Sequence, residues 1–183
     1  FIVSYDKDNV ETLLFQGDGS GTWTPVPTPV DRKICKLSIA DDIIYLSDKS
    51  ENFYYSTDKG ATFNQDTSLP KLYITSTGVF DIVSDGSTQY LNAQYKIYKG
   101  QYNSWTDFTP RKGSGELKDE EEIFGRVYYD TVDDRLYSGD SEGYIYAVDT
   151  PASAASTAWI QSDDNTPSGI GLQGMALLNV PTS

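Results

Sequence analysis

The chain has 183 residues, a length that fits one domain, and carries a formal net charge of −13 with a pI near 4.2. Such acidity disfavours nucleic acid, whose binding depends on Lys and Arg meeting phosphates, and it disfavours anionic membrane surfaces. No apolar run approaches roughly 18 residues, so no membrane insertion is expected. The count of 0 histidines excludes the Ser-His-Asp triad and most zinc centres.

Short strand patterns follow one another along the whole chain, separated by turn-forming Gly, Asp, Asn and Ser. Residues that favour pleated surfaces dominate these stretches, and Tyr alone occurs 14 times. We therefore expect an all-β protein. The expected strands are 1–5, 10–16, 22–26, 34–40, 43–48, 52–57, 61–66, 73–84, 88–94, 95–100, 104–109, 123–130, 134–139, 143–149, 157–162 and 172–180.

The most specific local pattern is Ser56-Thr57-Asp58-Lys59-Gly60-Ala61-Thr62-Phe63. Gly60 can adopt a positive φ in a tight turn, and the Asp58 carboxylate can fold back onto N–H groups a few residues on. Phe63 then opens the next strand. We expect Ser56, Asp58, Gly60, Thr62 and Phe63 to have a structural role, pinning one hairpin.

This S-x-D-x-G-x-T-aromatic pattern resembles the Asp box, the bacterial neuraminidase repeat of sialidases, sortilin-type receptors and other β-propellers. The resemblance implies a β-propeller in which the box lies away from the ligand. A complete sialidase site is not expected, because the chain is shorter than such enzymes and its arginines are dispersed. They are Arg32, Arg111, Arg126 and Arg135.

A repeat supports the propeller reading. A shift of 40 residues superposes Trp23 on Phe63, and a shift of 91 superposes the segment 50–55 on 141–146. The aromatic residues that open the last strand of each unit are Trp23, Phe63, Trp105 and Trp159. Their separations are 40, 42 and 54 residues, and 47 residues lead from Trp159 through the C-terminus round to Trp23. A four-stranded blade needs roughly 40–50 residues.

We therefore predict a four-bladed β-propeller with blades 172–183 plus 1–30, 31–71, 72–115 and 116–168. Strand 172–180 would join strand 1–5 in one sheet and close the ring. A fragment of a larger propeller and a β-sandwich are the alternative architectures.

Loops on the face opposite the Asp58 turn supply the candidate ligand residues. Short amides, carboxylates and a guanidinium suit sugar hydroxyls, although turn formation alone also favours such residues. Asp48 and Asn52 are expected to be exposed. The 91-residue spacing matches Asp48 with Gly139, which favours one unique site, or a protein partner, over a repeated sugar site. The candidates are Asp48, Asn52, Asn92, Asp140, Glu142 and Arg111, and Arg32 lies in the loops of the same face.

No cofactor is expected. Oxygen-rich segments at Asp6-Lys7-Asp8-Asn9 and Asp163-Asp164-Asn165 have the ligand type that Ca²⁺ prefers, but neither has EF-hand spacing. Bound Ca²⁺ remains a minor alternative.

These features favour a secreted or cell-surface, non-enzymatic binding module, with a lectin-like carbohydrate-binding propeller as the first hypothesis. A protein-interaction, adhesion or surface-structural propeller is the second. A small glycan-cleaving enzyme with a carboxylate pair is the third. The partner is thus a glycan or a protein surface, and the sequence leaves the ligand and the oligomeric state open.

Overall fold

The computed structural model describes residues 1–6, 11–28, 34–48, 50–69, 80–93, 96–110, 124–140 and 144–161. Its strands form four antiparallel sheets. The first contains β1 (Ile2–Asp6), β2 (Glu11–Gly17) and β3 (Trp23–Val26). The second contains β4 (Ile34–Ala40), β5 (Ile43–Asp48), β6 (Phe53–Ser56) and β7 (Asn64–Asp66). The third contains β8 (Phe80–Ser84), β9 (Gln89–Ala93), β10 (Lys96–Gln101) and β11 (Ser104–Asp107). The fourth contains β12 (Phe124–Asp130), β13 (Arg135–Asp140), β14 (Ile145–Asp149) and β15 (Ile160–Gln161).

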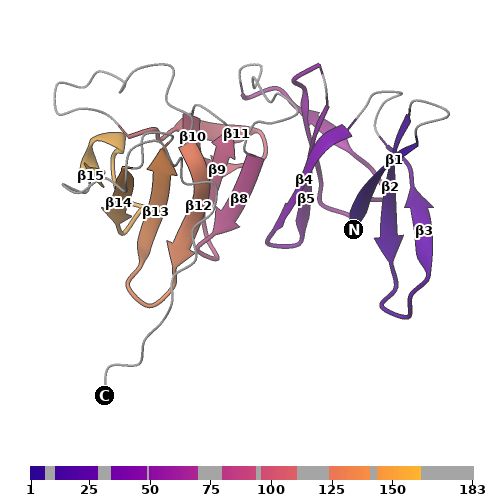
Figure 1. Ribbon diagram of the computed structural model, residues 1–183. Coiled ribbons are helices and arrows are strands. Elements are labelled where there is room, and N and C mark those ends of the chain that lie inside the picture. The colour runs from indigo at the N-terminus through magenta and orange to yellow at the C-terminus, as the bar shows by residue number, and fades with distance from the viewer. Residues whose placement is uncertain are drawn as a thin grey trace.

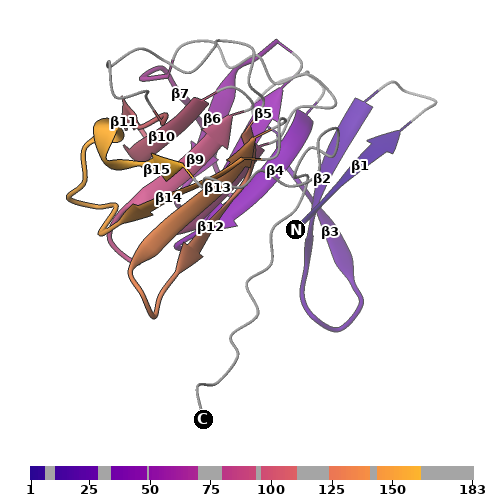
Figure 2. The same ribbon diagram turned by 60° about the vertical axis from the view of Figure 1, so that its left-hand side comes forward.

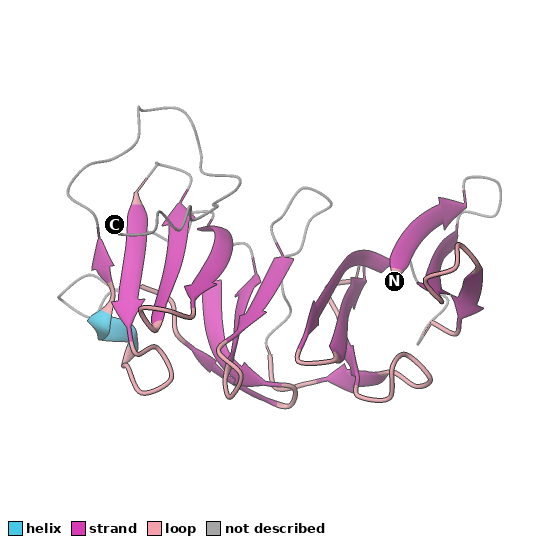
Figure 3. Cartoon of the chain, turned by 90° about the horizontal axis from the view of Figure 1, so that it is seen from below, coloured by secondary structure: helices cyan, strands magenta, loops and turns pink. Residues whose placement is uncertain are grey.

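Within each sheet the strands follow in chain order, and the sheets themselves stand side by side in chain order (Figures 1 and 2). The first strands of the sheets form the inner row, with β1 beside β4, β4 beside β8, and β8 beside β12. This is the blade arrangement of a β-propeller, as predicted, and the four sheets match the four expected units. The first and fourth sheets lie at opposite ends of an open arc (Figure 3).

Apolar side chains alternate between the two faces of each sheet, so each contact between neighbouring sheets has its own core cluster. Burying each of these side chains contributes about 1.5–3 kcal/mol. Leu14, Ile44, Leu46 and Tyr54 lie between the first and second sheets. Tyr45, Phe53, Tyr55, Ile82, Leu91, Tyr98 and Trp105 lie between the second and third. Tyr90, Ile97, Phe108, Val127, Leu136, Tyr146, Val148 and Trp159 lie between the third and fourth.

Two fully buried tyrosines in these clusters keep a polar partner for the hydroxyl group. Tyr45 and Tyr90 are both 0% exposed. The Tyr45 hydroxyl donates to Oε1 of Gln89 on the third sheet, which links two sheets through a buried hydrogen bond. The Tyr90 hydroxyl donates to Oδ2 of Asp85 at 2.6 Å. Burial raises the pKa of both phenols, so both stay protonated.

Two strand predictions need correction. Residues 156–158 form a 3-10 turn, so the last strand of the fourth sheet is only Ile160–Gln161 and not 157–162. The reason is local: the carbonyl of Thr150 accepts two N–H groups, and that of Ala155 accepts another, which holds this Ala-rich stretch in turns. The last strand of the second sheet is likewise shorter than predicted and starts at Asn64. The predicted closing strand 172–180 lies outside the described residues, so its pairing with strand 1–5 stays a prediction.

The repeat is also one residue longer than the sequence comparison indicated. Tyr54 packs toward the first sheet and Tyr146 toward the third, so both face the preceding sheet, and the spacing between them is 92 residues. The 91-residue shift instead matched Tyr146 with Tyr55, which faces the following sheet. Side chains alternate along a strand, so a one-residue slip exchanges the faces. With the corrected spacing, Asp48 at the end of β5 corresponds to Asp140 at the end of β13.

Two indole N–H groups provide a test of the contacts between sheets. Trp105 donates to the buried carboxylate of Asp66 at 3.0 Å, and Trp159 donates to the backbone carbonyl of Phe108 at 2.8 Å. We predict that Trp105→Phe lowers the free energy of unfolding by about 1.5–3 kcal/mol and Trp159→Phe by about 0.5–1.5 kcal/mol, because a hydrogen bond to a charged acceptor is the stronger. Urea unfolding measures both. Equal losses would contradict the assigned acceptors.

Candidate functional site

The expected ligand residues Asp48 and Asn52 form a closed turn between β5 and β6. Oδ1 of Asp48 accepts the N–H groups of Ser50 at 2.8 Å and Asn52 at 2.9 Å, and Oδ2 accepts the Asn52 amide at 2.8 Å and the Tyr54 hydroxyl at 3.3 Å. Asp48 is 0% exposed, so the expectation that it is exposed was wrong. Its carboxylate closes the turn, since a buried charge needs such donors.

A second polar group, which we call the Asp81 cluster, lies where the third and fourth sheets meet and contains Asp81, Asn92 and Arg126. Asp81 on β8 and Asn92 on β9 are cross-strand partners and share a face of the sheet. Asp81 alternates with Ile82, which packs toward the second sheet, so Asp81 faces the fourth sheet. The Arg126 guanidinium on β12 is close enough to act on Asp81 electrostatically.

Burial and charge act in opposite directions on Asp81. Burial raises the pKa of its carboxyl, and the positive charge of Arg126 partly opposes this rise. Asn92 is 0% exposed, whereas Arg126 is exposed and Asp81 is half-buried. The cluster is therefore reachable from solvent at its charged end.

Ser138 on β13 adds a hydroxyl group to this region. It lies two residues after Leu136 and opposite Val127, both of which pack against the third sheet, so Ser138 is on that same face. Ser138 is 0% exposed, and its hydroxyl oxygen makes no hydrogen bond within the described residues. A carboxyl, an amide, a hydroxyl and a guanidinium thus come from four strands of two sheets, and Asp81 and Arg126 are the two of these groups that solvent reaches.

The predicted site residues are only partly brought together. Asn92 belongs to the Asp81 cluster, whereas Asp48 and Asn52 close a turn of the second sheet. Asp140 ends β13 two residues after Ser138, and its side chain is outside the described part of the chain. Glu142, Arg111 and Arg32 lie outside the described residues, as does segment 163–165 of the possible Ca²⁺ sites.

Sequence reasoning missed Asp81 and gave Arg126 no role. One signal was available: Asp81 stands in the apolar stretch Phe80-Asp81-Ile82-Val83, where a charged residue is costly unless it has a partner.

The turn at 56–63 has the structure that its residues predicted. Asp58 accepts the N–H of Thr62 at 2.9 Å and its hydroxyl at 2.6 Å, and it also accepts the Ser56 hydroxyl at 2.8 Å. The Ser56 hydroxyl oxygen in turn accepts the N–H of Gly60, whose φ is +87°. The hydroxyl and N–H of Thr62, with Ser56, lower the pKa of Asp58 to about 2. This turn lies at the opposite end of β6 from the Asp48 turn.

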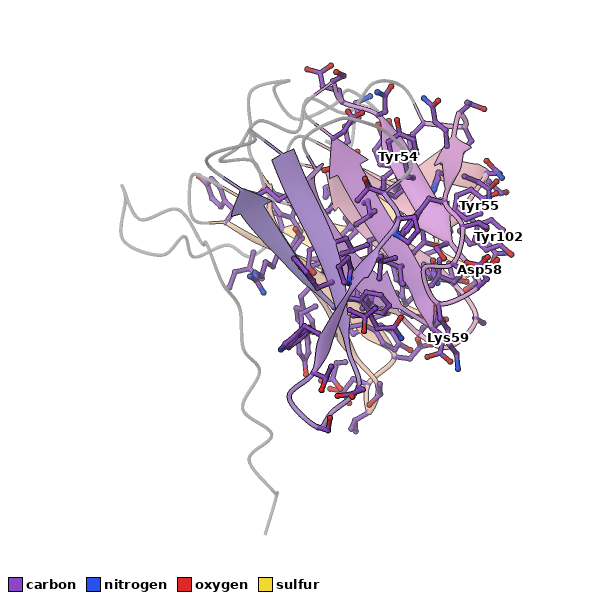
Figure 4. All side chains as sticks on the ribbon, turned by 90° about the vertical axis from the view of Figure 1, so that its right-hand side faces the viewer. Tyr54, Tyr55, Asp58, Lys59 and Tyr102 are labelled. Carbon is purple, nitrogen blue, oxygen red and sulfur yellow. The ribbon has the colours of Figure 1, made fainter. Side chains whose placement is uncertain are left out.

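An aromatic edge adjoins the Asp58 turn. The rings of Tyr55 and Tyr102 stack with centroids 4.5 Å apart, and the Asn103 amide donates to the Tyr55 hydroxyl at 2.6 Å. Figure 4 shows Tyr55, Tyr102, Asp58 and Lys59 along one edge of the molecule. These contacts tie the second sheet to the β10–β11 turn, so we assign them a structural role.

The described residues contain no helix long and apolar enough to cross a membrane. They also contain no group of three or more His, Cys, Asp or Glu side chains arranged to hold a metal ion.

No family model matches the sequence, and no curated protein matches it. Solved structures do match the fold. The GH74 enzyme of Niastella koreensis aligns with a TM-score of 0.58 at 16% identity, over 85% of this chain and 27% of that chain. The GH74 xyloglucanase of Xanthomonas campestris aligns with a TM-score of 0.51 at 17% identity, over 74% and 24%. The Swd1 β-propeller domain of Myceliophteria thermophila aligns with a TM-score of 0.52 at 10% identity, over 92% and 56%.

These likenesses show the β-propeller fold and, at such low identity, nothing beyond the fold. This chain spans between 24% and 56% of the length of these matching structures. The resemblance of residues 56–63 to the Asp box rests on the sequence pattern.

The Asp58 turn predicts a specific pH dependence of stability. The folded pKa of about 2 lies below the ordinary value of 3.8, so the ionised carboxylate stabilises the fold above that ordinary value and loses its effect as the pH falls toward 2. We expect Asp58→Ala to melt at a lower temperature than the parent protein at pH 7, with the difference shrinking between about pH 4 and pH 2.

Asp133→Ala is the matched control, because Asp133 is also an exposed aspartate in a turn. It should leave the melting temperature nearly unchanged at every pH. A deficit of Asp58→Ala that is independent of pH would show that its carboxylate does not hold the turn.

Proposed function

We propose that this protein is a non-enzymatic carbohydrate-binding module and that the Asp81 cluster is its ligand site. The observation that carries the proposal is that Asp81 and Asn92 share one face of the third sheet and that the positive charge of Arg126, on β12 of the fourth sheet, acts on the Asp81 carboxyl. A carboxylate that accepts and a guanidinium that donates can together bind adjacent hydroxyl groups of one sugar.

The position of the cluster supports a binding role. Asp81 and Arg126 lie on the inner strands β8 and β12, where neighbouring sheets approach each other most closely. Rigid strands on both sides keep the polar groups in place, which reduces the ordering cost of binding. The loop carboxylate of Asp48, in contrast, is occupied by its own turn and has no role in this proposal.

The non-enzymatic assignment rests on the chemistry of the cluster. Glycoside hydrolysis uses two carboxyl groups roughly 5–9.5 Å apart, one as acid and one as base or nucleophile. The Asp81 cluster, in the part that the structure describes, supplies one carboxyl beside a guanidinium. With 0 histidines in the chain, no imidazole is available as the second group. Two of the solved neighbours are GH74 enzymes, but they share only 16% and 17% of their residues with this chain, so they carry no site argument.

We predict that Arg126→Gln weakens binding of a glycan identified on an array by about tenfold or more, because a charge-assisted hydrogen bond contributes about 1.5–3 kcal/mol. Arg126 is exposed, so the melting temperature should hardly change. Asp81→Asn should weaken binding as well. Burial raises the pKa of Asp81, so its carboxyl becomes protonated at a higher pH than an ordinary aspartate does. The affinity of the parent protein should therefore begin to fall at that higher pH when the solution is acidified.

Asp107→Asn is the control, since this half-buried carboxylate pairs with Lys96 near the other edge of the third sheet. It should bind the glycan as the parent protein does. Steady release of reducing sugar would contradict the non-enzymatic assignment. If neither Arg126→Gln nor Asp81→Asn changes the affinity for the glycan, the binding site is elsewhere. If the protein binds polar peptides and no glycan, the ligand is a peptide and the carbohydrate assignment is wrong.

A further inference from the structure

One aromatic side chain recurs at every contact between neighbouring sheets. Phe63, Trp105 and Trp159 each stand at the start of an outermost strand and pack back onto the preceding sheet. Phe63 joins the cluster shared with the first sheet. The other two are 9% and 8% exposed and donate the indole N–H to the preceding sheet, at Asp66 on β7 and at Phe108 after β11.

Trp23 occupies the same position in the first sheet, which has no preceding sheet among the described residues. It is 47% exposed. Its ring lies against Gly17, whose added Cβ would meet it at 3.0 Å, and Gly17 is its cross-strand partner. Leu14 and Val26 point the other way, into the second sheet. The side of the first sheet that carries Phe15, Trp23 and Pro25, here called the N face, belongs to no core cluster of the described chain.

The fourth sheet presents the complementary surface. Val127, Leu136, Tyr146 and Val148 pack against the third sheet, so the alternating residues point to the opposite side. Tyr137 and Ala147 pair across β13 and β14, and Ile160, which is 66% exposed, pairs with Ala147. We call this side the C face. Its apolar and aromatic residues are Tyr128, Tyr137, Ala147 and Ile160.

The internal contacts show how such a face is used. Tyr45 on β5 faces the third sheet, is 0% exposed, and meets the Trp105 ring edge-on with centroids 6.1 Å apart. The corrected spacing of 92 residues maps Tyr45 onto Tyr137 of the C face. Tyr137 is therefore the position on which the aromatic residue of a following sheet packs.

We propose that the N face of one copy of this chain packs against the C face of a second copy, with Trp23 on Tyr137 at both contacts. The two faces are the two halves of the contact that already repeats inside the chain, and the arc holds them at opposite ends of one molecule (Figure 3). Contacts between unlike faces build either a closed ring or an open filament. In a closed ring of two copies, a two-fold axis relates the two contacts.

The size of a complete propeller supports two copies. Nearly the whole of this chain, 92%, aligns with just over half, 56%, of the Swd1 β-propeller domain. Two arcs of four sheets therefore supply about the material of one such ring. Trp23 and Ile160, which are 47% and 66% exposed, leave apolar surface open at the two ends, beside the Arg135–Asp149 ion pair on the side of the C face.

The test is the molar mass of the 183-residue chain by sedimentation and light scattering, near 0.15 M salt so that repulsion between the acidic copies is screened. We expect about twice the chain mass of 20.3 kDa. Trp23→Asp and Tyr137→Asp should each raise the dimer Kd at least about thirtyfold, as for a central aromatic at an interface. Circular dichroism should show that both variants keep their strands.

Val132→Asp is the control, because Val132 is 74% exposed but lies in the β12–β13 turn, away from both faces; it should stay dimeric. Mixing Trp23→Asp with Tyr137→Asp should restore part of the dimer, since the mixed pair keeps one intact contact. A monomeric parent protein would overturn the proposal, whether Trp23 is exposed or covered by the same chain. So would open-ended polymers, or a dimer that neither face variant weakens. Glycan binding is not involved, so this outcome is independent of the proposed function.

Discussion

The arrangement of the molecule depends on one aromatic side chain that leaves the start of an outermost strand and packs onto the sheet before it. In Trp105 and Trp159 the ring fills apolar space while the indole N–H reaches Asp66 or the carbonyl of Phe108. A buried indole N–H without an acceptor costs about 1–3 kcal/mol. Few relative positions of two sheets both bury the ring and give the N–H its acceptor. The second, third and fourth sheets are thus each oriented by the sheet before them.

The candidate site follows from the same constraint. Asp81 and Asn92 belong to the third sheet and Arg126 to the fourth, and Trp159 joins the same two sheets through its hydrogen bond to Phe108. The polar groups on the inner strands lie beside the apolar core between the sheets. The loop carboxylate of Asp48 instead accepts four hydrogen bonds from its own turn and from Tyr54, which stabilises the connection between two strands.

Local features were predictable from the sequence, and features between sheets were not. The Asp58 turn was predicted because its hydrogen bonds join residues at most four apart, such as Asp58 and Thr62. The repeat slipped by one residue because Phe53-Tyr54-Tyr55 places three aromatic residues in a row, so hydrophobicity does not show which face each one takes. Asp81 escaped notice because its environment depends on Arg126, a residue on another sheet.

Hydrogen exchange of the three indole N–H groups tests the central claim most directly, because the chain contains 3 tryptophans and each gives one resolvable signal. The account predicts that Trp105 and Trp159 exchange slowly at every protein concentration, since both donate to an acceptor on the preceding sheet. Trp23 should exchange slowly at high concentration and quickly on dilution. Fast exchange at Trp105 or Trp159 would contradict the proposed basis of the contacts between sheets.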